Sequence, residues 1–310
     1  MSELFTQGAI IAIVAGGIRL AVPLLIASLG ETYGQRSGVL NLGVDGIMLL
    51  GAFGGYYTVL KTGSPWIGLI VGIAIGVIMG LISAVMAVTL KAEQGISGIG
   101  VFLFGLGMSD LLFQKWVGTP RPIDKFPKLD IPGLSDIPWL GEMLFRHSVV
   151  IYLAFAAIPL SMYIINKTTF GMNIRAVGEN PEAADSLGVS VSRVRYATVT
   201  IGGTLAGVAG AILAIDLGIF QQNLTNARGF VAIALVYFGA WRPLGIMLGA
   251  LLYGLIDSLV LQLKVLEIVP REWSDIASMM PAVITILALV IVASRFKPPS
   301  ALTKPFTRGG

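Results

Sequence analysis

The fold is decided by residues 65–90, which read PWIGLIVGIAIGVIMGLISAVMAVTL and contain no charged side chain. Because a membrane-spanning helix needs about 20 mostly apolar residues, this stretch predicts one crossing of a bilayer. Gly68, Gly72, Gly76 and Gly80 recur at every fourth position, so they share one helix face. In lipid, a face of small residues lets a second helix approach closely. We predict these four glycines as helix-packing residues, within the chain or at a seam with another subunit.

The rest of the chain is also too apolar for a water-soluble protein. Of its 310 residues, 55% are hydrophobic and only 12% are charged, whereas soluble domains carry about 25% charged residues. This composition excludes a soluble enzyme, a disordered chain and a nucleic-acid-binding protein. The net charge of +4 fits the excess of basic residues on the cytoplasmic side of membrane proteins. We therefore predict a multi-pass protein of the inner or plasma membrane, embedded in lipid.

Similar apolar runs along residues 1–310 predict a single all-α transmembrane domain, a helical bundle of about nine segments. Their approximate ranges are 6–29, 38–60, 65–90, 96–117, 148–165, 194–215, 228–240, 244–263 and 276–294. Segment 228–240 is short for a crossing and is predicted to be short or re-entrant, while segment 38–60 opens with the run GVLNLG and is predicted to start irregularly. Non-helical backbone at membrane depth must be shielded by protein or face water. Both segments are therefore predicted to be inner elements.

Lysines and arginines in the short connections set the orientation of a membrane protein. The C-terminal tail carries four of them and is predicted to lie in the cytoplasm; they are Arg295, Lys297, Lys304 and Arg308. Alternation through nine segments then places the N-terminus outside. The predicted cytoplasmic side holds eleven lysines and arginines and the outer side nine, so the total favours this orientation only slightly.

Two connections are long, and their compositions differ. Residues 118–147 contain five prolines and are predicted to form an ordered, non-helical cap on the outer face, because proline restricts a long connection. His147 is the single histidine, and cysteine is absent. Since a metal site or a catalytic dyad is hard to assemble from one imidazole, we predict an interfacial histidine, no metal, no cofactor on this chain and no enzyme activity.

The second long connection, residues 166–193, contains the signals of a short helix. Asn180 is a good N-cap, Pro181 suits the first helical position, and Gly188 suits the position after the helix. They predict a helix over 181–187 that stands alone between two membrane segments. So short a helix is unstable in isolation, and something must hold it. From these residues alone, its own bundle and a groove on a soluble partner are equally good explanations.

Three stretches resemble a family of ABC-importer permeases that serves sugars, nucleosides and branched-chain amino acids. The first, GMNIRAVGENP at 171–181 with the small and apolar residues up to position 189, resembles the cytoplasmic loop of that family. The second, GVLNLGVDGIM at 38–48, resembles the N-terminal signature of its nucleoside and simple-sugar branch, which more often has Glu at the position of Asp45. The third is GAWRPLG at 239–245.

The resemblance implies a permease subunit that imports nucleosides, or else simple sugars, delivered by an external binding protein. It also implies a second, related permease, with a heterodimer favoured over a homodimer, and a cytoplasmic ATP-binding subunit that carries ATP and Mg. This chain has no Gly-x-x-x-x-Gly-Lys-[Ser/Thr] run of its own for cradling phosphates. The implied coupling residues toward the ATP-binding subunit are Asn173, Arg175, Gly178, Glu179, Asn180, Pro181, Ala183, Ala184, Leu187 and Gly188.

A pathway for a neutral polar substrate needs hydrogen-bonding groups and, for a base or a sugar ring, aromatic faces. The candidate pathway residues are Asn41, Asp45, Phe53, Ser97, Phe102, Asn223 and Tyr237. Each has an alternative role in packing or at the membrane interface. For Asn41 we favour that alternative, the satisfaction of irregular backbone, although the two roles are compatible.

Ionisable residues inside the membrane point to a rival function, an ion-coupled secondary carrier for a small polar solute. They are costly there and are functional candidates by default. Of the few present, Asp257 is the best candidate for a coupling carboxylate, while Asp110 falls near a segment end. Arg19 is predicted to form an ion pair with an aspartate that the sequence does not identify.

Overall fold

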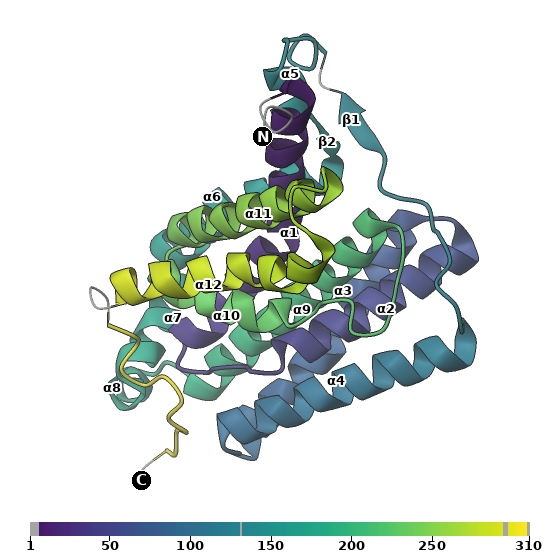
Figure 1. Cartoon of the computed structure of the whole chain (residues 1–310). Helices are drawn as coiled ribbons and strands as arrows, with labels where there is room; N and C mark the ends of the chain where they lie inside the picture. Colours follow the sequence, from purple (N-terminus) through teal and green to yellow (C-terminus); the bar gives the residue numbers. More distant parts are fainter. Residues whose placement is uncertain (1–5, 131, 294–296, 309–310) are drawn as a thin grey trace.

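Helices make up most of the computed structural model, which describes residues 6–130, 132–293 and 297–308 (Figure 1). In chain order they are α1 (Gln7–Arg36), α2 (Val44–Thr62), α3 (Pro65–Ala84), continued by a π-helical turn (Val85–Thr89), α4 (Gln94–Trp116), α5 (Leu140–Leu144), α6 (Val149–Lys167), α7 (Thr169–Glu179), α8 (Pro181–Ser186), α9 (Val191–Leu217), α10 (Arg228–Phe238), α11 (Pro243–Val265), a 3₁₀ turn (Arg271–Trp273) and α12 (Ser274–Ala293). Two short strands, β1 (Lys128–Asp130) and β2 (Arg146–Ser148), complete the described elements.

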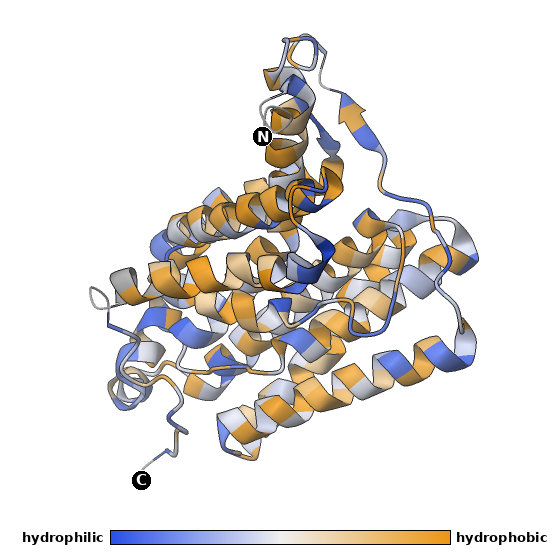
Figure 2. Cartoon of the chain, viewed as in Figure 1, coloured by the Kyte–Doolittle hydropathy of each residue, from blue (hydrophilic) through white to orange (hydrophobic). Residues whose placement is uncertain are grey.

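Six helices are long and apolar enough to cross a membrane: Gln7–Arg36, Pro65–Thr89, Gln94–Trp116, Val149–Lys167, Val191–Leu217 and Pro243–Val265. α2, α10 and α12 cover the three other predicted segments. In Figure 2 apolar residues run along the visible sides of α4, α11 and α12, whereas hydrophilic residues gather around α7, α8 and the strands. The chain is therefore an all-α, multi-pass membrane bundle, as its composition predicts.

The interface between α3 and α9 is built on glycine. A Cβ atom added at Gly76 would lie 2.6 Å from the carbonyl oxygen of Gly203, and one added at Gly72 would lie 2.5 Å from the Cβ of Ala211. At Gly80 the nearest atom is the carbonyl oxygen of Thr200, at 3.0 Å. The glycine face of α3 is thus occupied by a helix of the same chain, and the two backbones approach as closely as small residues permit.

Replacing Gly76 with alanine is expected to destabilise the bundle by about 1–3 kcal/mol, the usual cost of overpacking, because the added methyl group meets backbone that cannot rotate away. Gly107→Ala is the matched control, since nothing lies within 4 Å of a Cβ at Gly107 and alanine favours a helix. Thermal unfolding of both variants in detergent measures the difference. Equal melting temperatures would contradict the close approach of α3 and α9.

The centre of the bundle consists of α1, α2 and α9. The second half of α1 is buried almost without interruption from Leu20 to Gln35, and most of α9 is buried as well. α4 lies at an edge of the bundle in Figure 1 and exposes large apolar side chains such as Ile96 and Leu103. The ends of these central helices therefore carry the polar residues of the candidate site, such as Glu31 at the end of α1 and Asp45 at the start of α2.

The long connection over residues 118–147 contains more regular structure than predicted. β1 and β2 pair antiparallel, with Asp130 opposite Arg146, and their side chains form an ion pair at 3.7 Å. Between the strands, α5 forms a single short helix. The Ser135 hydroxyl donates at 3.1 Å to the backbone carbonyl of Phe145, the residue that follows the end of this helix. The prediction of a non-helical loop is therefore wrong at α5, because local polar groups satisfy the ends of that helix.

Candidate functional site

The chain leaves the helical conformation between the end of α1 and the start of α2. Residues 37–43 are non-helical, as predicted for the start of segment 38–60, and Gly38 has a φ of +91°. That region favours glycine, and a Cβ at Gly38 would also lie 2.9 Å from a guanidinium nitrogen of Arg195. α2 begins only at Val44.

Buried side chains satisfy the backbone of this non-helical stretch. The amide of Leu40 donates to Gln94 Oε1 at 2.8 Å, and the amide of Asn41 donates to Glu31 Oε1 at 3.0 Å. The amide of Gly43 donates to Asn41 Oδ1 at 2.9 Å. This shielding by protein is what irregular backbone inside a membrane requires, and it includes the backbone role favoured for Asn41.

Glu31 starts a hydrogen-bond chain that connects two of the motifs. Its carboxylate also accepts from Gln35 Nε2 at 3.1 Å, and Gln35 Oε1 accepts from Trp241 Nε1 at 2.8 Å. The chain therefore joins the non-helical stretch to the turn between α10 and α11. Sequence reasoning misses Glu31 because the predicted first segment, 6–29, stops two residues before it, whereas α1 continues to Arg36. The signal was the pair Glu31 and Gln35, four residues apart on one helix face.

Asp45 joins the first turns of α2 and α10. Its carboxylate accepts from the amide of Gly229 at 2.7 Å and from the hydroxyl of Thr225 at 3.0 Å. The residue is only 1% exposed. A carboxylate at the N-terminus of a helix is stabilised by the unsatisfied amides there. In this conformation Asp45 thus holds two inner helices together and does not face a cavity.

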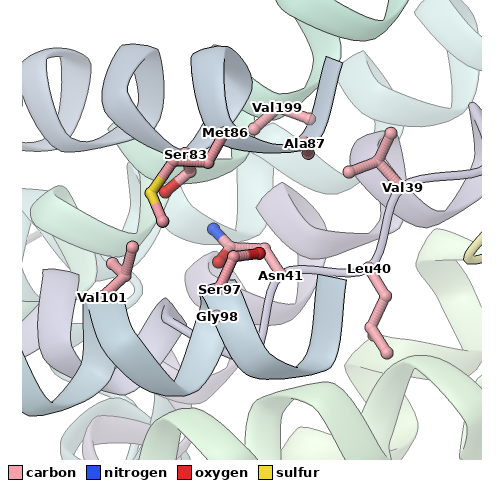
Figure 3. A pocket seen from close by; sticks show the side chains of 10 residues that line it. All are labelled: Val39, Leu40, Asn41, Ser83, Met86, Ala87, Ser97, Gly98, Val101 and Val199. Carbon is pink, nitrogen blue, oxygen red and sulfur yellow. The ribbon is translucent and has the colours of Figure 1, made fainter. Parts of the chain in front are cut away.

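Asn41 and Ser97, two of the predicted pathway residues, line one small cavity. Figure 3 shows their side chains close together, facing Ser83 and Met86 of the α3 helix and its π-helical turn. The cavity measures about 10 Å³, which is space on the order of a single water. The structure therefore brings polar groups together here around a space that is too small for a solute.

Two predicted pathway residues, Phe53 and Phe102, pack against other aromatic rings. Phe53 is buried, and its ring meets that of Phe220 edge-on at a centroid distance of 5.5 Å. Phe102 meets Phe230 edge-on at 5.1 Å. The second contact links α4 to α10, so these phenylalanines fasten the inner helices to their neighbours.

The last two predicted pathway residues lie apart from each other. The ring of Tyr237 packs edge-on against Trp241 at 4.9 Å, next to the turn after α10. Asn223 is exposed before α10, and its amide donates to Asp110 Oδ1 at 3.3 Å. The seven predicted pathway residues therefore lie on or next to α2, α4 and α10 and do not form one pocket, although Asn41 and Ser97 line a common cavity.

Two ion pairs involve the charged residues of the apolar segments. Arg19 pairs with Asp216 at 3.2 Å, which confirms the predicted ion pair and identifies its partner. Asp257 pairs with Arg228 at 3.0 Å, and both side chains are about one-fifth exposed. Asp257 therefore has a fixed cationic partner at the start of α10, an arrangement that suits structural attachment.

Among the described residues, no group of three or more His, Asp and Glu side chains is placed to hold a metal ion. His147 lies buried in β2, outside the membrane-spanning helices, with Nε2 at 2.9 Å from the carbonyl oxygen of Met143. Burial lowers the pKa of its imidazole below the ordinary value, so the ring is neutral at pH 7.

The predicted cytoplasmic loop folds into two helices. α8 covers Pro181–Ser186, and the amide of Ala183 donates to Asn180 Oδ1 at 3.0 Å, which confirms the predicted N-cap. Gly188 has a φ of +86°, as predicted for the residue after the helix. The prediction that this helix stands alone is wrong, because α7 precedes it directly and buries Ile174 completely.

The helices of the loop have one attached face and one open face. Ala184 and Val177 are buried in a cluster with Tyr33 of α1 and Ile165 of α6. Leu187, by contrast, is 86% exposed. The bundle therefore holds the loop, as the first of the two sequence explanations requires, and the outer face of α8 is left accessible.

The C-terminal tail connects this loop to the non-helical stretch before α2. The amide of Ala301 donates to the carbonyl of Gly178 at the end of α7 (2.8 Å), and the amide of Thr303 donates to the carbonyl of Gly38 (3.1 Å). In Figure 1 the tail runs past α8 on its way to the C-terminus. A few tail residues thus contact both the loop and the break between α1 and α2.

Arg195, at the start of α9, fixes the tail in place. Its Nε donates to the carbonyl of Ser37 at 3.1 Å and its Nη1 to the carbonyl of Lys304 at 2.9 Å. The guanidinium is buried. Arginine is rarely buried unless it is paired, and here the two carbonyl groups are its partners. Arg295, which contributed to the topology prediction, lies outside the described residues.

These features define a class of protein: a multi-pass helical membrane protein with a buried non-helical stretch between α1 and α2 and with an α7–α8 loop held against the bundle. Residues 13–289 match the family described as "Branched-chain amino acid transport system / permease component". The chain belongs to this family. No solved structure matches it.

Named relatives of the chain are transport permeases. It is 40% identical, over 81% of its length and 77% of the relative, to the "Putative glucose ABC transporter permease protein" of Haloferax volcanii. It is 35% identical to the guanosine ABC transporter permease protein of Bacillus subtilis, over 96% and 97% of the two chains. It is 34% identical to a nucleoside ABC transporter permease protein of Lactococcus lactis, over 93% and 94%.

Proposed function

We propose that this chain is the membrane-spanning permease subunit of an ATP-driven ABC importer for nucleosides, with simple sugars as the second substrate class. The observation that carries the proposal is the α7–α8 loop, anchored by Ala184 and open at Leu187, in a member of a permease family. Two relatives that cover more than nine-tenths of the chain are named for guanosine and for nucleosides, which favours nucleosides over sugars.

The other components follow from the same proposal. α8 is the coupling helix, and its open face docks on an ATP-binding subunit that holds ATP and Mg. A second, related permease chain completes the pathway as a heterodimer, and an external binding protein delivers the substrate. The C-terminus is cytoplasmic, and α2, α10 and α12 complete nine membrane segments. Analysis of the purified complex by native mass spectrometry tests the heterodimer, because two different permease masses are expected and a single mass contradicts it.

Movement of the loop opens the small cavity at Asn41 and Ser97 in this proposal. Closure of the ATP-binding subunits displaces α8, and the hydrogen bonds from the tail to Gly178 and Gly38 carry the displacement to the break before α2. A hydrogen bond weakens steeply when its geometry is distorted, so we expect the tail to follow a shift of either partner. The polar side chains around the cavity then separate and admit the substrate.

A transport assay tests the proposed function. The complex is reconstituted in vesicles, and the ATPase rate and uptake are measured with guanosine, glucose and leucine, each with its delivering protein. We expect ATP-dependent uptake of the nucleoside and stimulation of the ATPase by it. Stimulation by glucose alone would move the substrate class to sugars, and uptake without ATP would contradict the importer.

The rival carrier is tested at the pair of Arg228 and Asp257. Asp257→Asn combined with Arg228→Gln removes both charges of the pair and leaves neither unpaired, which avoids the cost of an isolated charge. We expect ATP-dependent uptake to persist within about threefold, a change of less than 1 kcal/mol. A gradient-driven carrier that uses Asp257 would instead lose uptake in this variant and would need no ATP.

A further inference from the structure

A second cavity, unrelated to the predicted pathway, lies where the end of α1 meets α7. It has a volume of about 230 Å³, and its walls include Arg36, Arg175, Trp241 and Lys297. These residues come from the end of α1, from α7, from the turn between α10 and α11, and from the C-terminal tail. Four segments far apart in the sequence therefore contribute to one pocket.

The pocket is strongly cationic. Arg36, Arg175 and Lys297 line it, and Glu179 is the single acidic residue in its wall. Arg175 and Arg242 both lie close enough to Arg36 to repel its guanidinium, and Glu179 lies close enough to attract it. The carboxylate of Glu179 also accepts a hydrogen bond from the hydroxyl of Ser300 at 3.0 Å, so it is shared with the tail.

The cations that line the pocket have no carboxylate partner close enough for an ion pair. Other arginines of this structure are paired, as Arg228 is with Asp257 and Arg308 with Asp185. Within residues 6–130, 132–293 and 297–308, no ion pair involves Arg36, Arg175 or Lys297. The bias of basic residues toward the cytoplasm explains which side they occupy. It does not explain their convergence, because like charges brought together raise the free energy unless an anion compensates them.

The wall of the pocket is fixed before any ligand binds. Trp241 is only 5% exposed and is held by its hydrogen bond to Gln35. The Nε of Arg175 donates to the carbonyl of Gly171 at 3.4 Å, which orients its guanidinium. Guanidinium groups match the geometry of phosphate oxygens and bind them through paired hydrogen bonds. Two arginines, one of them oriented by this bond, and a lysine thus suit the several oxygens of a phosphate group better than a spherical anion such as chloride.

We propose that this pocket binds a phosphate group, either of inorganic phosphate or of the headgroup of an anionic phospholipid. The volume accommodates a phosphate with a small headgroup. The lipid source is favoured by position, since basic pockets between membrane helices on the cytoplasmic side bind anionic headgroups. The lipid source rests on the proposed cytoplasmic position of this face, and the wall shares Arg175 and Glu179 with the predicted coupling residues. Neither source of phosphate depends on the proposed substrate.

Binding is tested with the full-length chain purified in detergent. Native mass spectrometry measures retention of phosphatidylglycerol against phosphatidylcholine, and thermal unfolding measures stabilisation by inorganic phosphate against chloride at equal ionic strength. The pocket variant combines Arg36→Gln and Lys297→Gln. The control variant combines Lys91→Gln and Lys167→Gln, which removes the same charge from two exposed residues outside the pocket.

We expect the pocket variant to bind at least tenfold more weakly than the wild type, and the control to bind as the wild type does. Lys297→Gln alone, in the exposed tail, keeps the test valid if the double variant unfolds, and is expected to weaken binding by a smaller factor. Retention of phosphatidylglycerol identifies a lipid source, and stabilisation by phosphate alone identifies a soluble one. Binding of neither ligand, or equal loss in both double variants, overturns the proposal.

Discussion

The variant Leu187→Asp is expected to lose its ATP-binding subunit during purification while its own fold stays intact. Leu187 is 86% exposed, so the permease gains little stability from it, and surface substitutions usually change stability by less than about 0.5 kcal/mol. In the proposed complex, by contrast, the side chain is buried against the partner. Losing a buried leucine costs about 1.5–3 kcal/mol, and burying an unpaired carboxylate adds to this.

The expected loss of affinity is therefore about a hundredfold or more. It is measured as the amount of ATP-binding subunit that remains with a tagged permease, together with the melting temperature of the permease alone. Leu140→Asp is the matched control, because this leucine is also exposed, at 51%, and belongs to α5 in the predicted outer connection. If Leu187→Asp retains its partner as fully as Leu140→Asp does, α8 is not the docking element.

The variant Asp45→Ala is expected to cause the largest loss of stability of any single substitution discussed. The carboxylate accepts from the amide of Gly229 and the hydroxyl of Thr225, and all three residues are buried. Each buried donor left without an acceptor costs about 1–3 kcal/mol. Part of this loss of stability arises at the start of α10, because the first amides of a helix have no acceptor within the helix. We expect α10 to detach from α2 and uptake to fall with stability.

Two further variants separate the contributions at this junction. Thr225→Val removes one donor together with its need for an acceptor, so it is expected to cost less than Asp45→Ala. Asp45→Asn keeps one oxygen for the Gly229 amide, so its loss of stability is expected to lie between those of Thr225→Val and Asp45→Ala. Thermal unfolding in detergent gives the order. A melting temperature of Asp45→Ala equal to that of Thr225→Val would show that the contact with Gly229 contributes nothing.

Much of the architecture was predictable because lipid imposes simple rules. A run such as residues 65–90 must be helical, since its backbone has no other partner in a bilayer. The cap at Asn180 and the left-handed Gly188 were equally predictable, because each depends on chemistry within a few residues. Sequence reasoning overlooks α7 although local signals for it exist, because Phe170, Ile174 and Val177 recur at helical spacing and Thr168 caps its start. The contacts that bury Ile174 and Val177 against distant helices are not recorded in this local pattern.

The site was less predictable for the same reason. That Arg19 needs an acidic partner followed from the cost of burying a charge, but the choice of Asp216 depends on how α1 meets α9. The convergence of Arg36 with Lys297 depends on the path of the tail. Pairings between remote segments are a property of the packed bundle, and the composition of each segment does not contain them.

The path of the tail also makes the loop around α8 depend on a segment that is remote in the sequence. The bonds from Ala301 to Gly178 and from Thr303 to Gly38 give the loop and the break before α2 a shared support that neither region can supply for itself. A chain truncated before residue 301 lacks both bonds, so the two regions lose this support together.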